Sequence, residues 1–350
     1  MASLYDVVLK KKQANSQITC NPTLDVFDLD YCKILDSLVT TDLFIADKVR
    51  DCMKELRLAG GIDYNGHYRS AYEAYNEAIT YYVLKQRGQI VNHIPEASEP
   101  TPDFEVEFSY LNWEKKKVQS KVYIEVKSLG FADGNNEYKR AQEEALQCNI
   151  QIENQIKEGR RICTSYYSIC PLSNKDKGPT SEIEEFNKKI NNNIKEEQFR
   201  YGNGEDSVLY VDFGQYMCTF KDEECLPVYP NIIKRYSASG RLWMLAFGKE
   251  GERIFTWPEF DGKGNIDSDL MMPGILNSFD YIKGIIFSFG CKQGEKRLYG
   301  FYRYEDQDSE VAIFIHKVCD FYNDDQNSCG YEYYKALEGE LKKRYNSSFD

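Results

Sequence analysis

Two segments with alternating apolar and polar residues constrain the fold of this chain most strongly. They cover residues 103–108 and 118–127, and the residues between them, 112–117, are polar. Side chains of a β-strand point alternately to its two faces. Each segment therefore predicts a strand with one apolar face, and the polar residues between them predict the turn of a hairpin.

The two apolar faces also define how the strands pair. A turn centred on Glu114 places Asp103 opposite Glu125 and Phe104 opposite Ile124. In this register apolar residues face apolar ones and polar residues face polar ones, and a slip by one residue would destroy the match. The same register also pairs Val106 with Val122 and Glu107 with Lys121.

Three polar side chains emerge together at one end of this hairpin. Asp103 follows Pro102 at the start of the first strand, and Glu125 and Lys127 lie near the end of the second strand on its polar face. Two carboxylates can hold Mg²⁺, which activates water and stabilises charge at a phosphate, and a lysine can orient the nucleophile. The alternative is an ordinary amphipathic hairpin whose exposed face is charged.

A helix just before the hairpin offers a further carboxylate. Residues 68–87 carry small and aromatic apolar residues at helical spacing, and Gly88 is placed to end the helix. Glu73 and Glu77 lie one turn apart on its flank, and either could reach the edge of the sheet. Taken alone, a glutamate in such a position is more often solvated than catalytic.

The order of these features resembles the PD-(D/E)XK nuclease superfamily, whose fold is called restriction-endonuclease-like. The resemblance covers about residues 65–215, and every motif position is filled. It rests on Asn76-Glu77-Ala78 with Leu84 and Gly88, on Pro102-Asp103, and on Glu125-Val126-Lys127.

The resemblance implies an α/β fold with a central mixed sheet flanked by helices, and a Mg²⁺-dependent nuclease site in which Mn²⁺ can substitute. Asp103 and Glu125 would be metal ligands together with the backbone carbonyl of Val126, and Lys127 would be the catalytic lysine. The distance to the helix-ending glycine favours Glu77 over Glu73 as the accessory acidic residue, which would also belong to the catalytic and metal-binding residues. The resemblance also suggests DNA as the substrate, and a role in bacterial restriction, repair or mobile-element defence.

Net charge argues against tight, unspecific binding of DNA by the isolated chain. The 350 residues carry a formal net charge of −12, whereas affinity for a polyanion normally comes from lysine and arginine. We therefore expect a local basic channel, a homodimer or a partner subunit to supply affinity. No apolar run approaches the length of a membrane span and the N-terminus has no signal-peptide core, so we expect a cytoplasmic protein without a membrane partner.

Several basic residues are candidates for substrate contacts. The lysines at the hairpin turn are interpreted as a solvated turn that discourages edge pairing. The remaining candidates follow the hairpin, and a solvated position is the alternative for each of them. They are Lys139, Arg140, Arg160 and Arg161.

Three regions are predicted along the chain: a helical segment over 1–62, the nuclease-like core over 63–220, and a β-rich aromatic extension over 221–350. The extension is expected to extend the sheet, recognise substrate or form a dimer. Further helices are predicted at 41–58, 136–157, 180–197 and 332–345. Further strands are predicted at 161–169, 207–213, 241–247, 281–289, 298–304 and 311–316.

The sequence therefore predicts a Mg²⁺-dependent nuclease that hydrolyses phosphodiester bonds, in DNA rather than RNA. Two alternatives stay open. One is a catalytically silent binding or assembly module that keeps the nuclease fold, which the acidic charge and the aromatic C-terminal half motivate. The other is a nuclease directed at RNA or gated by a small ligand.

Overall fold

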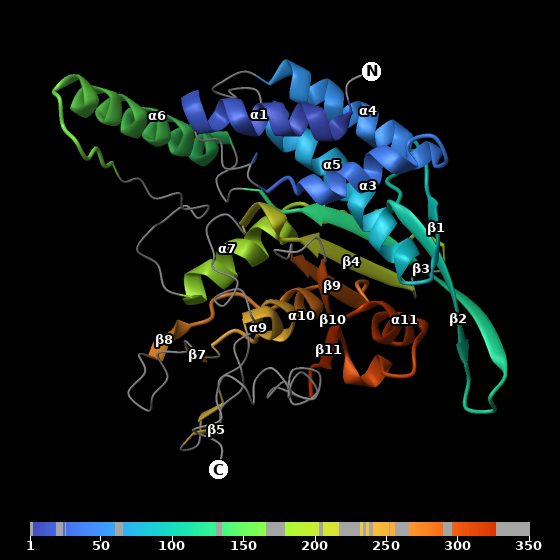
Figure 1. Ribbon diagram of the computed structural model, residues 1–350. Coiled ribbons are helices and arrows are strands. Elements are labelled where there is room, and N and C mark those ends of the chain that lie inside the picture. Colours follow the sequence, from blue (N-terminus) through green and yellow to red (C-terminus); the bar gives the residue numbers. More distant parts are fainter. Residues whose placement is uncertain are drawn as a thin grey trace, which may run out of the picture.

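The computed structural model is an α/β protein built around one mixed sheet of seven strands (Figure 1). The strand order is β1-β2-β3-β4-β9-β10-β11. The structure describes residues 3–18, 24, 26–59, 66–130, 135–165, 179–202, 206–216, 232–233, 236–237, 241–251, 253–255, 266–289 and 296–326. Within these residues, no helix is long and apolar enough to cross a membrane.

The strands of the main sheet are β1 (Ile90–His93), β2 (Phe104–Leu111), β3 (Lys117–Ser128), β4 (Ser207–Asp212), β9 (Gly284–Phe289), β10 (Arg297–Tyr302) and β11 (Phe321–Asp324). Two small two-stranded sheets consist of β5 (Ile232–Ile233) with β6 (Tyr236–Ser237), and β7 (Arg253–Phe255) with β8 (Ile266–Asp269). The longer helices are α1 (Leu4–Ile18), α3 (Leu29–Leu38), α4 (Leu43–Leu58), α5 (His67–Gln86), α6 (Asn135–Lys157), α7 (Pro179–Asn191) and α11 (Glu310–Val318). The shorter ones are α8 (Glu196–Phe199), α9 (Arg241–Phe247) and α10 (Ile275–Ser278), with 3₁₀ turns at Gly214–Tyr216 and Tyr304–Asp306.

The predicted hairpin register is confirmed. Strands β2 and β3 are antiparallel, and Phe104 pairs with Ile124 while Glu107 pairs with Lys121. The apolar residues of β2 are buried and the acidic ones between them are partly exposed. Strand β3 then pairs in parallel with β4, and β4 pairs in parallel with β9.

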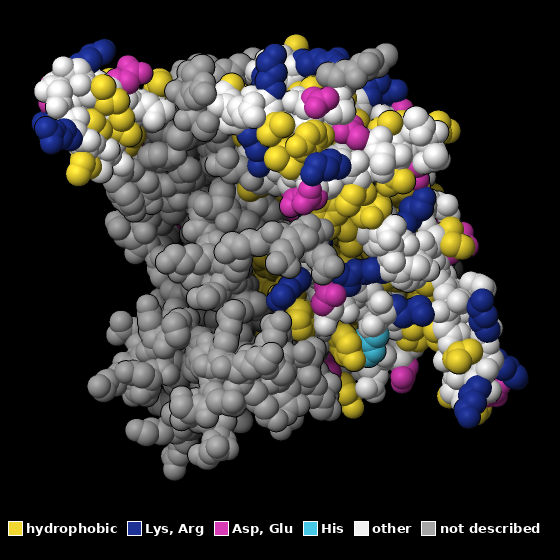
Figure 2. Space-filling model, in the orientation of Figure 1, with side chains coloured by type: hydrophobic (Ala, Val, Ile, Leu, Met, Phe, Trp, Pro, Cys, Tyr) yellow, Lys and Arg dark blue, Asp and Glu magenta, His cyan; other side chains and the backbone are white. Residues whose placement is uncertain are grey.

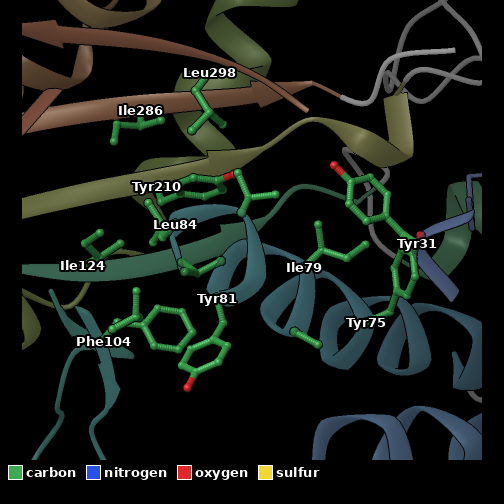
Figure 3. Close-up of a cluster of buried hydrophobic side chains, with 14 of the residues drawn as sticks. Tyr31, Tyr75, Ile79, Tyr81, Leu84, Phe104, Ile124, Tyr210, Ile286 and Leu298 are labelled. Carbon is green, nitrogen blue, oxygen red and sulfur yellow. The ribbon is translucent and has the colours of Figure 1, made fainter. Parts of the chain in front are cut away.

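Helices cover both faces of the sheet. One face packs against α5 and α11, with α1, α3 and α4 forming a further layer beyond α5 (Figure 1). Figure 3 shows this core, in which Tyr81 and Leu84 of α5 face Phe104, Ile124 and Tyr210 of the strands. The other face packs against α7, α9 and α10. Because β4 and β9 lie between both layers, every residue of these two strands is buried, as expected for central parallel strands.

Helix α5 forms where the sequence predicts it. Its last turn ends before Gly88, which takes a positive φ of 78° that favours glycine. The predicted apolar stripe is buried, but so are many residues on other sides of the helix. The reason is that the sheet packs on one side of α5 and the N-terminal helices pack on the other.

Two predicted strands are wrong, because residues 241–247 and 311–316 lie in helices α9 and α11. Of the strand predicted over 161–169, residues 161–165 form no strand, and residues 166–169 lie outside the described part. Both helices are short and largely buried, and periodicity does not separate a buried strand from a buried helix in so short a run. Ser309 caps α11 through a 3.2 Å hydrogen bond from the N–H of Ala312, a helix signal that the strand prediction overlooked.

The sheet continues past residue 220. Strands β9, β10 and β11 come from the predicted C-terminal extension and complete the sheet that β1–β4 begin, which is one of the roles predicted for this region. The predicted helix over 180–197 is divided into α7 and α8. The predicted helix over 332–345 lies outside the described residues.

Candidate metal and catalytic site

The start of β2 and the end of β3 bring three predicted site residues together. Asp103 precedes β2, and its Oδ2 accepts a 2.7 Å hydrogen bond from the backbone N–H of Val126. Glu125 is only 3% exposed, and its Oε1 lies 2.5 Å from Nζ of Lys127. The antiparallel register thus joins a carboxylate from each strand and a lysine within one small region.

The backbone of Val126 faces the same region. Its N–H donates to Asp103, the residue just before β2. The N–H therefore points from β3 toward the side on which β2 lies. The N–H and the C=O of one strand residue point to the same side of the strand. The carbonyl of Val126 is therefore directed toward the side on which the Asp103 carboxylate lies.

Gln198 of α8 completes the surroundings of Glu125. Its Nε2 donates to Oε1 of Glu125 at 2.8 Å and to the carbonyl of Thr101 at 3.3 Å. The other carboxylate oxygen, Oε2, is buried and has no hydrogen-bond partner among the described residues. A buried oxygen of this kind is costly unless a proton or a cation reaches it.

Burial and nearby negative charge raise the pKa of both carboxyl groups. The pKa of Asp103 is raised to about 8, first by burial and then by the charge of Glu125, with a smaller contribution from Glu77. The pKa of Glu125 is raised by burial, against the opposing effects of Lys127 and Gln198. Adjacent carboxyl groups of this kind cannot both ionise without a compensating charge.

The donor set fits a hard divalent cation. Mg²⁺ prefers carboxylate and carbonyl oxygens and usually keeps several waters, so one or two carboxylates suffice. Asp103 and Glu125 supply such oxygens, including the buried Oε2 that lacks a partner. Within the described part of the chain, no three Asp, Glu, His or Cys side chains gather into a metal-binding cluster.

Glu77 lies near this pair but has a partner of its own. It forms an ion pair with Lys48 of α4, and it contributes to the raised pKa of both Asp103 and Glu125. Glu73 lies one turn earlier and is 3.5 Å from Nε of Arg69. Burial raises the pKa of Glu73 as well. Both candidate glutamates of α5 are thus close to cations of the protein.

Of the four predicted basic residues, the structure describes the side chains of Arg160 and Arg161 only. Lys139 and Arg140 belong to α6, but their side chains lie outside the described part. Arg160 is exposed and forms an ion pair with Glu158, and Arg161 is exposed nearby. Both follow α6, which projects from the body of the molecule in Figure 1.

Lys189 of α7 is a cation near this end of the sheet that the sequence analysis missed. Its Nζ donates to the carbonyl of Gly130, just beyond β3. A Cβ at Gly130 would meet Oε1 of Gln215 at 3.2 Å and Cδ of Arg69 at 3.4 Å, so Arg69 and Lys189 both border this glycine. No motif marks Lys189, because α7 follows the hairpin by about 50 residues.

A buried polar network lies behind the candidate site. Nζ of Lys296 is 2.5 Å from Oδ1 of Asp212 and donates to Oδ1 of Asn76 at 2.7 Å. Nδ2 of Asn76 donates to Oγ of Ser128 at 2.8 Å. Oδ2 of Asp212 accepts from Tyr72 at 2.8 Å. This network ties α5, which carries Glu77, to the end of β3, which carries Lys127.

Comparison with protein-family models, with curated proteins and with solved structures found no match to this chain.

The raised pKa of Asp103 predicts how stability depends on pH. A carboxyl group whose pKa is higher in the folded state favours folding at low pH, and that contribution is lost as the pH rises from about 4 to about 8. The metal-free protein should therefore lose unfolding free energy over this range. In Asp103→Asn the loss should be smaller by up to about 6 kcal/mol, because each pKa unit between the unfolded and folded values corresponds to about 1.4 kcal/mol.

Urea denaturation at a series of pH values in EDTA measures this effect. Glu105→Gln is the matched control, because Glu105 lies on the polar face of β2 in a surface ion pair with Lys121. Adding Mn²⁺ at pH 8 should raise the unfolding free energy of the wild type more than that of Asp103→Asn. Equal effects of Mn²⁺ on the two proteins would contradict a metal site at Asp103.

Proposed function

We propose that this protein is a Mg²⁺-dependent nuclease with a restriction-endonuclease-like core, acting on DNA rather than RNA. One observation carries the proposal: two adjacent carboxyl groups, Asp103 and Glu125, lie beside Lys127 at the end of a hairpin, with raised pKa values that a cation would relieve. Perturbed carboxyl groups beside a lysine are typical of catalytic sites.

Each residue has a distinct part in this proposal. Asp103, Glu125 and the carbonyl of Val126 would hold the metal, which, when bound, supplies Lewis-acid stabilisation and a more acidic water. Lys127 would orient the attacking water and balance negative charge that develops at the phosphate. Gln198 holds the Glu125 carboxylate in place through its 2.8 Å hydrogen bond.

Glu77 would have an accessory role in this proposal. In this structure the Glu77 carboxylate forms an ion pair with Lys48, and no third carboxylate joins Asp103 and Glu125 in a metal-binding cluster within the described residues. The negative charge of Glu77 nevertheless adds to the repulsion that raises the pKa of both groups. Glu77 would therefore increase the affinity of the site for a cation.

The acidic charge of the chain bears on how it holds its substrate. A net charge of −12 opposes a polyanion, so contact must come from local cations, from a second copy of the chain or from a partner subunit. Arg69 and Lys189, which border Gly130, are local cations for a phosphate near the site. A role in restriction or mobile-element defence fits a nuclease of this kind and belongs to the proposal.

The net charge also motivates a second candidate, a binding module that keeps the fold without catalysis. The two candidates differ in whether the chain cuts nucleic acid. The test is a time course on plasmid, linear and single-stranded DNA and on RNA, with Mg²⁺, Mn²⁺ or EDTA. Metal-dependent cutting of one substrate is expected, whereas intact substrates together with no Mn²⁺ binding at Asp103 would favour the binding module.

A further inference from the structure

The outer part of the β2–β3 hairpin projects beyond the sheet. Strand β1 pairs with β2 only as far as Glu107, and β4 pairs with β3 only from Tyr123 onward. Between these limits, over residues 108–122, the two strands pair only with each other among the described residues. We call these residues the hairpin arm, and Figure 1 shows its end extending beyond α11.

Helix α11 supports the arm at its base. The ring of Phe108 lies 5.5 Å from that of Phe314, and the hydroxyl of Tyr110 donates to Oε1 of Glu310 at 3.0 Å. An isolated two-stranded hairpin is marginally stable in water. These contacts fix the direction of the arm, so its end is held at a defined place relative to the candidate site.

The end of the arm exposes a tryptophan. Trp113 is 89% exposed, and Leu111 beside it is 69% exposed. The turn is well defined, because Lys115 and Lys116 donate backbone hydrogen bonds of 2.8 and 2.9 Å to Asn112. Lys115 holds a φ of 59°, a conformation that favours glycine or asparagine over lysine. Neither the exposed ring nor the lysine at this φ stabilises the hairpin.

The same turn concentrates positive charge. Lys115, Lys116 and Lys117 are consecutive and exposed, and Glu114 pairs with Lys116 at 2.6 Å. The tip, residues 111–117, therefore carries a net charge of about +2 on a chain with a net charge of −12. Figure 2 shows dark blue side chains gathered at the end of the arm.

We infer that the tip is a second contact for single-stranded nucleic acid, and this inference rests on the proposed function of the Asp103–Glu125 site. Trp113 would stack on an unpaired base, and Lys115 and Lys117 would contact phosphates, the combination that binds single strands without sequence preference. Eight residues of β3 separate Lys117 from Glu125, which corresponds to roughly 26 Å. A stacked strand of about eight nucleotides spans that distance.

Binding of a fluorescein-labelled 20-nucleotide oligothymidine to the full-length protein, measured by anisotropy in EDTA, tests the inference. Trp113→Ala should weaken binding about tenfold or more, whereas Trp113→Phe, which retains a ring for stacking, should stay within about threefold of the wild type. Lys115→Gln with Lys117→Gln should weaken binding and reduce its salt dependence. Lys115→Arg with Lys117→Arg should retain both the affinity and its salt dependence.

Binding and cutting are scored separately, so the inference and the proposed function can fail independently. Trp113-dependent binding without cleavage of any substrate would support the tip contact and reject the nuclease. Metal-dependent cleavage with binding unchanged in Trp113→Ala would reject the tip contact and leave the nuclease. Failure of the wild type to bind the oligonucleotide, or a Trp113 effect seen with anionic lipid vesicles alone, would also overturn the inference.

Discussion

Replacing Lys127 with alanine should reduce metal-dependent cleavage by at least about a hundredfold, the lower range for losing a positioned proton-transfer or charge-balancing group. Two effects combine. The change removes the cation 2.5 Å from Oε1 of Glu125, and it removes one of the interactions that oppose the raised pKa of that group. The measurement is the initial rate on whichever substrate the wild type cuts, with saturating Mg²⁺.

Lys121→Ala is the matched control for this experiment. Lys121 lies on the same polar face of β3, outside the tip, and its ion pair with Glu105 is surface-exposed, so cleavage should stay close to the wild-type rate. Both variants should keep the wild-type circular dichroism spectrum. If Lys127→Ala cuts as fast as Lys121→Ala, the assignment of Lys127 is wrong.

Replacing Asp212 with alanine should lower the unfolding free energy by about 3–5 kcal/mol, the range for breaking a buried ion pair. Lys296 would be left as a buried, uncompensated cation, since both side chains of this pair are almost fully buried. The hydroxyl of Tyr72 and the backbone N–H of Gly214 would also lose their acceptor. Urea denaturation measures the loss.

Two comparisons separate the lost charge pairing from a general effect of substitution. Asp30→Ala removes one partner of an exposed ion pair with Lys33, and should cost less than about 1 kcal/mol. Combining Asp212→Leu with Lys296→Met should cost less than Asp212→Ala, because no buried charge remains unpaired. A double variant as unstable as Asp212→Ala would show that packing or the other hydrogen bonds dominate.

The hairpin and its register were predictable because both depend on neighbouring residues with strict alternation. Phe104 and Ile124 pair as expected, and this register alone places Asp103 opposite Glu125. The three residues of the proposed chemistry were therefore identified from about 25 consecutive positions.

The surroundings of the site could not be predicted in the same way. Gln198 reaches Glu125 across 73 positions, and Lys296 reaches Asp212 across 84. No local periodicity encodes contacts between such distant segments. The same limit explains α9 and α11, where burial on several sides makes a short helix as apolar as a buried strand.

The order of strands in the sheet has a consequence for biosynthesis. Strand β4 lies next to β9, whose residues emerge from the ribosome only after about 70 more have been added. Until then β4 is an open edge that can pair with another nascent chain, and Asp212 has no lysine to neutralise it. We therefore expect the sheet to close only after residues 284–296 have been synthesised, whereas the Asp103–Glu125 hairpin and Gln198 have emerged before then.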